Sequence, residues 1–329
     1  MPERKIDIGF DYEKLGNIYM KRSLPKQAIK WYKKAITKYL SAKPPPSINL
    51  ADSYFYLGKI FLSIEKYSKA KLYLIKARKL LQENLSPSDV QIVKINIELG
   101  RLKYSQNRFH MSTKYYQLAL NICEQQPKLV YHDLIYIHSL LGLSLSTEQK
   151  YDQAMYHCQK VLEISKERMS TSYEEDEQID MIITRVYERI VQIHIHDNKI
   201  DEALTNARAC LKISRQYPMN YFNLGNSLLL MGSVYRHKEL YKRSLVCLRK
   251  ARHLINKCSY EYQTQLLPYI YAELGIFYNR MSDHRYRTAY KYYKLARNTS
   301  LNSHDENFRR DIEENIKNLQ NQCGDLLEI

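Results

Sequence analysis

The sequence predicts an all-α fold built as a stack of similar helical hairpins, and three observations lead to this prediction. The dipeptide Leu-Gly recurs at residues 15, 57, 99 and 141, a step of 42 residues each time, and a fixed period of a few tens of residues marks a repeat architecture. Within each repeat, apolar residues are spaced three or four apart, as on one face of a helix. Small residues also recur at fixed places, where two helices can pack closely.

The first repeat shows what each unit contains. The apolar positions of its two expected helices are Tyr12, Leu15, Tyr19, Ala28, Tyr32 and Ala35. The first three share one face of a helix, and the last three share one face of another, so the two helices are expected to pack against each other in antiparallel.

Glycine occupies one fixed place in the repeat. Six of the nine glycines stand there: Gly16, Gly58, Gly100, Gly142, Gly232 and Gly275. Because glycine within a helix costs about 1 kcal/mol relative to alanine, its repeated use indicates a packing role. In the fifth repeat Val191 stands in this place, and looser or shifted packing is expected there.

This pattern resembles the tetratricopeptide repeat, whose motif places a large residue, Leu-Gly and Tyr on a first helix, and Ala, an aromatic residue and Ala on a second. The resemblance covers nearly the whole chain and implies a right-handed α-solenoid of about seven helix-turn-helix units with a C-terminal capping helix. The period is most similar to that of kinesin light chain and the Pins-type adaptors. The units are expected at about 9–43, 47–85, 88–126, 128–169, 176–216, 219–257 and 260–302.

Both ends of the chain are expected to lie outside this array. Residues 1–8 are expected to form an N-terminal arm. Residues 303–329 are expected to form a capping helix and a tail, because Phe308, Ile312 and Ile316 follow a helical spacing. Such a helix would cover the apolar face that the last repeat leaves open.

Two places depart from the regular pattern. Between the fourth and fifth units the repeat is longer, and the extra residues fall at 169–179, a segment rich in Asp and Glu. We expect a solvated loop leading into a helix start, where carboxylates are favourable; the alternative is a docking or regulatory loop. Pro268 lies close to the last unit, so either that unit's first helix begins there or a longer helix runs through it.

Composition places the chain among helical proteins of a reducing compartment. No apolar run approaches the ~20 residues that span a bilayer, and the N-terminus shows no secretory signal. The six cysteines form no C-x-x-C pair, so they are expected to be buried and reduced rather than to bind zinc or form disulfides. The expected location is cytoplasmic.

No motif for catalysis, a metal or a cofactor is present. The sequence lacks a Gly-rich phosphate loop, H-E-x-x-H and G-x-S-x-G. His194 and His196 are two residues apart and would point to different faces of a helix, so they cannot hold one ion together. The prediction is a protein that is not an enzyme and uses no cofactor or metal.

The resemblance implies that the first helices line a concave groove in which a peptide or helix of a partner protein lies. Positions expected to face this groove hold nine Lys or Arg and five Asp or Glu. A basic groove with apolar anchors predicts a partner that carries acidic and hydrophobic groups. The candidate binding residues are Asn17, Lys21, Lys59, Arg101, Tyr104, Arg189, Gln192, Arg236, Asn279 and Arg280.

A second function class stays open because the second helices are more basic than the groove. Five lysines lie between residues 26 and 38, and more follow between 66 and 79. A positive surface of this kind binds polyanions by releasing counterions. The alternative is therefore binding of RNA, an acidic filament or an acidic membrane surface through the convex helices.

Overall fold

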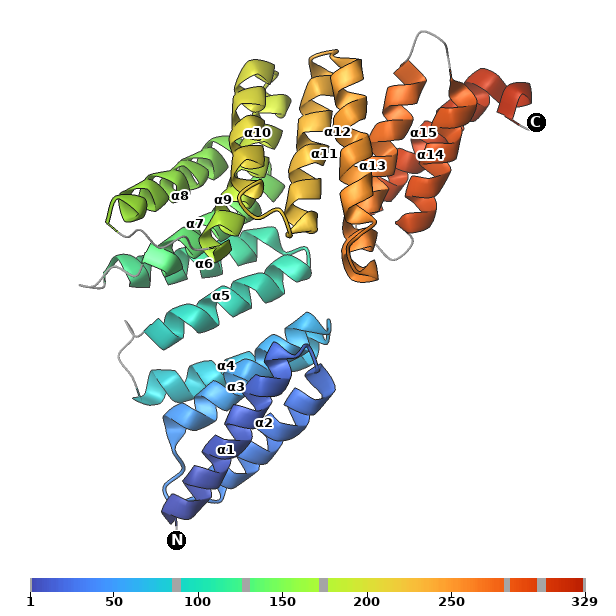
Figure 1. Cartoon of the computed structure of the whole chain (residues 1–329). Coiled ribbons are helices and arrows are strands. Elements are labelled where there is room, and N and C mark those ends of the chain that lie inside the picture. The colour runs from blue at the N-terminus through green and yellow to red at the C-terminus, as the bar shows by residue number, and fades with distance from the viewer. Residues whose placement is uncertain are drawn as a thin grey trace. The chain divides into compact units, whose positions relative to one another are not determined.

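The computed structural model describes residues 2–84, 90–125, 131–171, 177–280, 285–300 and 306–327. Within these ranges the chain forms fifteen α-helices and no strand (Figure 1). The prediction of an all-α fold made of helical hairpins is confirmed. The chain divides into two compact units, residues 1–168 and 169–329, and the division falls at the start of the acidic insertion.

The first unit is a series of antiparallel hairpins. Its helices are α1 (Pro2–Lys21), α2 (Pro25–Leu40), α3 (Ser47–Ser63), α4 (Tyr67–Asn84), α5 (Val90–Ser105), α6 (Phe109–Glu124), α7 (Tyr131–Thr147) and α8 (Tyr151–Thr171). From α1 to α7 each helix packs on the next one along the chain. Residues 2–8 belong to α1, so the arm expected there is in fact the first part of a helix. Gly9 of this helix lies against the Tyr39 ring of α2.

The second unit repeats the arrangement. Its helices are α9 (Glu177–His196), α10 (Ile200–Ser214), α11 (Tyr221–His237), α12 (Tyr241–Ile255), α13 (Tyr260–Arg280), α14 (Tyr286–Thr299) and α15 (Glu306–Leu327). Each helix packs on the next, and α9, α11 and α13 also contact one another in turn. Pro268 lies inside α13, so a single helix runs through it. Of the insertion at 169–179, residues 172–176 lie outside the described residues.

The recurrent glycines allow the two helices of a hairpin to approach closely. A β-carbon on Gly100 would lie 2.4 Å from Cε1 of Tyr116, which is far inside van der Waals contact. The same relation holds in six hairpins, between the pairs Gly16–Tyr32, Gly58–Leu74, Gly100–Tyr116, Gly142–Cys158, Gly232–Leu248 and Gly275–Tyr293. Most of these partners are large, so a side chain of the second helix fills the space above the glycine. The predicted packing role is confirmed.

The fifth hairpin buries both residues at this place without the glycine. Val191 of α9 takes the glycine position, and the residue at the partner position on α10, sixteen residues later as in the first hairpin, is Ala207. Both are 0% exposed and belong to one core cluster. The larger side chain is on the first helix and the smaller one on the second, the reverse of the hairpins that carry the glycine. The expectation of looser or shifted packing considered the first helix without its partner, and both residues at this place are buried.

The turn between the two helices is the same in six hairpins. A residue other than glycine adopts positive φ, between 55° and 61°, and the next amide donates to a carbonyl five residues earlier, as from Leu24 N–H to Tyr19 C=O at 3.0 Å. This is the Schellman arrangement that ends a helix. The positive-φ residues are Ser23, Glu65, Asn107, Gln149, Asn198 and Glu239.

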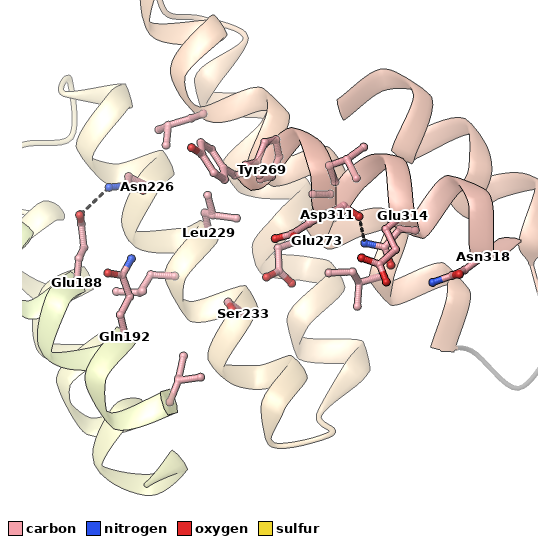
Figure 2. A pocket seen from close by; sticks show the side chains of 18 residues that line it. Glu188, Gln192, Asn226, Leu229, Ser233, Tyr269, Glu273, Asp311, Glu314 and Asn318 are labelled. Atoms are coloured by element: carbon pink, nitrogen blue, oxygen red, sulfur yellow. Dashed lines mark hydrogen bonds between the residues drawn. The ribbon is translucent and has the colours of Figure 1, made fainter. Parts of the chain in front are cut away.

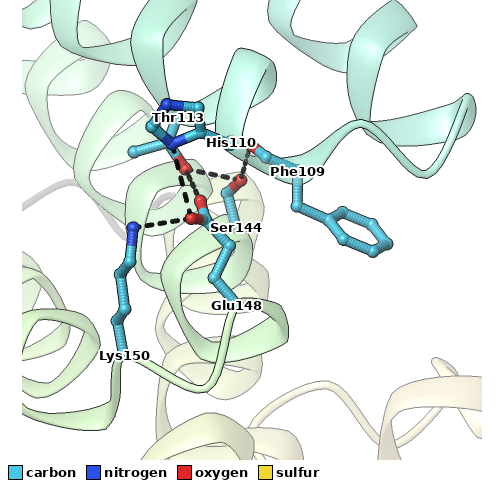
Figure 3. A network of polar contacts seen from close by, with 6 residues as sticks. All are labelled: Phe109, His110, Thr113, Ser144, Glu148 and Lys150. Carbon is cyan, nitrogen blue, oxygen red and sulfur yellow. Dashed lines mark hydrogen bonds and ion pairs between the residues drawn. The ribbon is translucent and has the colours of Figure 1, made fainter.

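A polar network joins α6 to the end of α7 and the turn that follows it (Figure 3). The Thr113 hydroxyl donates to Glu148 Oε1 at 2.5 Å, and Lys150 Nζ donates to Glu148 Oε2 at 2.7 Å. The Ser144 hydroxyl, 2.9 Å from that of Thr113, donates to the Phe109 carbonyl at 3.1 Å. Burial alone would raise the pKa of Glu148, but the bonds from Lys150 and Thr113 lower it overall. The network therefore fixes one hairpin against the next through a charged carboxylate.

Two buried histidines link α7 and α8. Nδ1 of His138 lies 2.8 Å from Nδ1 of His157, and both side chains are buried. Burial, the neighbouring His157 and Lys160 lower the pKa of His138 to about 4. Burial also lowers the pKa of His157. The pair is therefore neutral in the folded protein at physiological pH, with one imidazole donating to the other.

The glycine contacts predict the outcome of one substitution and of its rescue. Gly100→Ala is expected to lower the free energy of unfolding by about 1–3 kcal/mol, the usual cost of overpacking, because the new methyl group meets the Tyr116 ring. A Gly100→Val variant is expected to lose stability for the same reason. Adding Tyr116→Ala to it reproduces the arrangement of Val191 and Ala207 and is expected to recover part of the free energy of unfolding that Gly100→Val loses. Urea unfolding of the three variants measures both effects, and an unchanged midpoint for Gly100→Ala would contradict the packing role.

The histidine pair predicts a loss of stability in mild acid. Because the folded pKa values are lowered, the unfolded chain binds more protons below the ordinary value of 6.5. Stability is then lost as pH falls from 6.5 toward 4, at no more than about 1.4 kcal/mol per pH unit for each group. Thermal unfolding at pH 7.5 and 5.0 should show a smaller drop for His138→Leu/His157→Leu than for the unchanged chain. The exposed His253 provides the control His253→Leu; equal drops in all three proteins would refute the assignment.

Candidate partner-binding site

A cavity of about 700 Å³ lies among the helices of the second unit (Figure 2). It is formed by α9, α11 and α13, which are the first helices of three successive hairpins, and by α15. Its lining residues are Glu188, Gln192, Ile195, Asn226, Leu229, Leu230, Ser233, Leu266, Tyr269, Ala272, Glu273, Ile276, Phe308, Asp311, Ile312, Glu314, Asn315 and Asn318. Aliphatic and aromatic side chains thus alternate with amides and carboxylates.

Helix α15 both covers the last hairpin and forms a wall of this cavity. Ile312, Ile316 and Leu319 are buried, and the helix packs on α14, as expected of a capping helix. Its Phe308 ring lies 4.4 Å, centroid to centroid, from that of Tyr269 on α13. Polar side chains of α15, among them Asp311, Glu314 and Asn315, line the cavity. The helix therefore contributes polar groups to the site and also covers the last hairpin.

Four carboxylates come from three of the four helices: Glu188 on α9, Glu273 on α13, and Asp311 and Glu314 on α15. Asn226 Nδ2 of α11 donates to Glu188 Oε1 at 2.6 Å. Burial raises the pKa of Glu188 to about 7, although Arg189 and Arg185 pull it down. Glu188 is therefore a carboxylate that has lost part of its hydration and accepts a hydrogen bond from an amide.

Glu273 differs because it is already paired. Arg236 Nε donates to Glu273 Oε2 at 2.7 Å, and its Nη2 donates to Oε1 at 3.1 Å. This two-bond geometry is the strong form of an arginine–carboxylate pair, and Arg236 is only 9% exposed. Burial and Arg236 together lower the pKa of the adjacent His237, so this histidine adds no positive charge at neutral pH.

The candidate residues of the second unit are only partly brought together. Gln192 lines the cavity. Arg236 is not a lining residue, but it is paired with Glu273, which is one. Arg189 is partly buried and acts electrostatically on Glu188. Asn279 is partly buried and Arg280 is exposed; neither lines the cavity.

The candidate residues of the first unit mostly bond to their own neighbours. Lys59 Nζ and Arg101 Nη1 both approach Glu98, at 3.9 and 3.1 Å. Asn17 accepts from the Tyr32 hydroxyl at 2.7 Å. Tyr104 Oη lies 3.1 Å from Thr147 Oγ1. Lys21 is exposed.

Some of the predicted groove cations are already paired with carboxylates in the structure. The cations expected to attract an acidic partner include Arg101 and Arg236, and the structure pairs them with Glu98 and Glu273. The cavity itself has no Lys or Arg among its lining residues. Sequence reasoning also missed the polar residues of α15, whose spacing offered a signal: Asp311, Asn315 and Asn318 form a helical stripe beside the apolar one.

A second, smaller pocket in this unit has the opposite charge. It measures about 450 Å³ and lies between α10, α11 and α12. Four leucines form its apolar part, and its basic groups are Arg215, Arg249, Lys250 and His253. The chemistry that the sequence predicted for the groove is therefore present here, and the second helices contribute most of it.

The part of the chain that the structure describes contains neither a cluster of metal ligands nor a membrane-spanning helix. No group of three His, Cys, Asp or Glu side chains there could hold a metal ion. No helix there is both long and apolar enough to cross a bilayer.

Known proteins share the helical-hairpin architecture of this chain. Residues 12–37 match the family model of the tetratricopeptide repeat. No curated protein sequence matches the chain. Among solved structures, the apo form of the quorum sensor NprR from B. thuringiensis is 10% identical and covers 95% of this chain and 87% of its own, with a TM-score of 0.66.

Two further structures have the same fold. A tetratricopeptide repeat protein from Parabacteroides merdae is 13% identical, with coverage of 95% of this chain and 99% of its own and a TM-score of 0.60. The apo form of RapI is 17% identical, with coverage of 81% and 95% and a TM-score of 0.62. At these identities the likeness establishes the fold alone.

The buried pair beneath the cavity predicts a large effect of one substitution. Glu273→Leu leaves Arg236 buried without its carboxylate, and removing one partner of such a pair is expected to cost about 3 kcal/mol. Arg280→Leu removes an exposed arginine on the same helix and is expected to change the free energy of unfolding by less than about 0.5 kcal/mol. Chemical denaturation compares the two variants, and similar small losses would argue against the structural role of Glu273.

Proposed function

Since the chain is a tetratricopeptide-repeat protein, we propose that it is a scaffold or adaptor that binds a segment of a partner protein in the cavity between α9, α11, α13 and α15, and that it catalyses no reaction. The cavity carries this proposal. A volume of about 700 Å³ accepts several side chains, and its mixture of apolar groups with amides and carboxylates is typical of sites that hold an extended or helical peptide.

The way the site is built supports binding rather than chemistry. Its groups stand on four long helices, of which α9, α11 and α13 contact one another in turn and α15 packs on α14, so they are held in place by regular helices. The proteins with similar folds include one described as a quorum sensor, which is a recognition role. The buried thiols of Cys123, Cys158 and Cys210 suit a reducing compartment, and we place the scaffold in the cytoplasm.

A second function rests on the first unit. Residues 1–168 hold 28 Lys and Arg against 15 Asp and Glu, whereas residues 169–329 hold 23 against 20. Helix α2 contains five lysines and no acid. This concentration of charge favours the alternative, binding of a polyanion such as RNA through the second helices of the first unit.

Selection from a random dodecapeptide phage library, with the full chain immobilised, tests the first function. Binding peptides are expected, and Leu229→Glu should abolish their binding because it places a charge in the cavity. Val246→Glu makes the same change on the exposed side of α12 and should leave binding intact.

The same proteins distinguish the polyanion alternative. If no selected peptide is sensitive to Leu229→Glu, the cavity is not the binding site. Tight binding of polyuridylate that weakens steeply with salt, and that is lost when Lys30, Lys33 and Lys34 are changed to Gln, would then support the alternative.

A further inference from the structure

The lining of the cavity carries acidic side chains in addition to its apolar ones. Asp311 and Glu314 are exposed on α15, and Glu188 stands on α9, which contributes the far end of the same lining (Figure 2). Glu273 is neutralised by Arg236. Three acidic side chains therefore face one apolar cavity whose lining contains no Lys or Arg.

We propose that this cavity recognises a positively charged side chain, an arginine or lysine carried by an apolar segment of the partner. The proposal rests on the proposed function and specifies the partner's chemistry. The guanidinium or ammonium group would lie beside Asp311 and Glu314, with the charge of Glu188 acting from the far end of the same lining. The apolar stem and neighbouring residues would contact Leu229, Ile276 and Phe308. Charge and shape then match together, because a long cationic side chain carries its charge at the end of an aliphatic stem.

Glu188 gives this recognition a defined dependence on pH. The charged groups around it are Arg185 and Arg189 on its own helix, with Asn226 of α11 as its hydrogen-bond partner. Cys210 lies on α10, which packs beside α9, and burial together with the charge of Glu188 raises the pKa of its thiol. Because burial raises the pKa of Glu188 to about 7, part of the population is protonated near neutral pH. A bound cation favours the ionised form, so binding releases a proton and strengthens as pH rises.

An acidic partner segment does not suit the same cavity. Its carboxylates would meet Asp311 and Glu314 across an apolar, partly dehydrated space, where like charges repel strongly. The pocket between α10 and α12 offers such a segment Arg215, Arg249 and Lys250 instead. These two pockets of the second unit therefore favour opposite partner charges.

The experiment uses an array of nonapeptides with randomised apolar positions and one fixed residue that is arginine, citrulline or glutamate. Citrulline has nearly the shape of arginine without its charge. The full chain is expected to bind arginine peptides about tenfold more tightly than citrulline peptides, the factor that corresponds to one charge-assisted contact, and glutamate peptides more weakly still. Asp311→Asn/Glu314→Gln should remove the preference for arginine over citrulline, whereas Arg249→Gln/Lys250→Gln should leave it unchanged.

The outcomes separate this proposal from the function on which it rests. Peptides that bind in a Leu229-dependent manner without preferring arginine, or that prefer glutamate, would overturn the charge assignment and leave the peptide-binding function standing. Absence of Leu229-dependent binding by any class would overturn both. As a second readout, arginine-peptide affinity should rise between pH 6 and 8, and Glu188→Gln should flatten this rise; an unchanged slope in that variant would contradict the role of Glu188.

Discussion

The close approach of the two helices within each hairpin is the constraint on which the rest of the structure depends. It requires a small residue on one helix opposite a larger one on the other, as with Gly100 beneath Tyr116. The fifth hairpin shows that the requirement concerns the pair and not the glycine, since Val191 and Ala207 meet it with the sizes reversed. Because the backbones are then set at a fixed spacing, the first helices of successive hairpins can pack side by side within a unit, as α9, α11 and α13 do.

The candidate site follows from that regularity together with one exception to it. Helices α9, α11 and α13 contact one another in turn because each opens a hairpin of the same design. Helix α15 has no second helix among the described residues, yet it packs on α14 and adds a wall to the cavity. A helix that was expected only to cover an apolar end thus supplies Asp311 and Glu314, which lie outside any repeat position.

The sequence predicted the hairpins, the glycine contacts and the capping helix, because these depend on residues close together in the chain or at a fixed period. It could not predict the charge of the site. Whether Arg236 attracts a partner depends on Glu273, which lies 37 residues away on another helix. Likewise, Lys59 and Arg101 come from different hairpins and share one carboxylate, that of Glu98. A count of charges at groove positions therefore does not give the charge that a single cavity presents.

Net charge is an equally poor guide to the partner, because it is distributed unevenly along the chain. The formal charge of +16 arises mainly in residues 1–168, and residues 169–329 are close to neutral. At physiological ionic strength charges act over about 8 Å, so the potential inside the cavity is set by its own carboxylates rather than by distant lysines. Added salt would weaken a polyanion bound to the first unit much more than a cationic segment held in a partly dehydrated cavity. A strongly basic chain can for this reason contain a site that selects a basic partner.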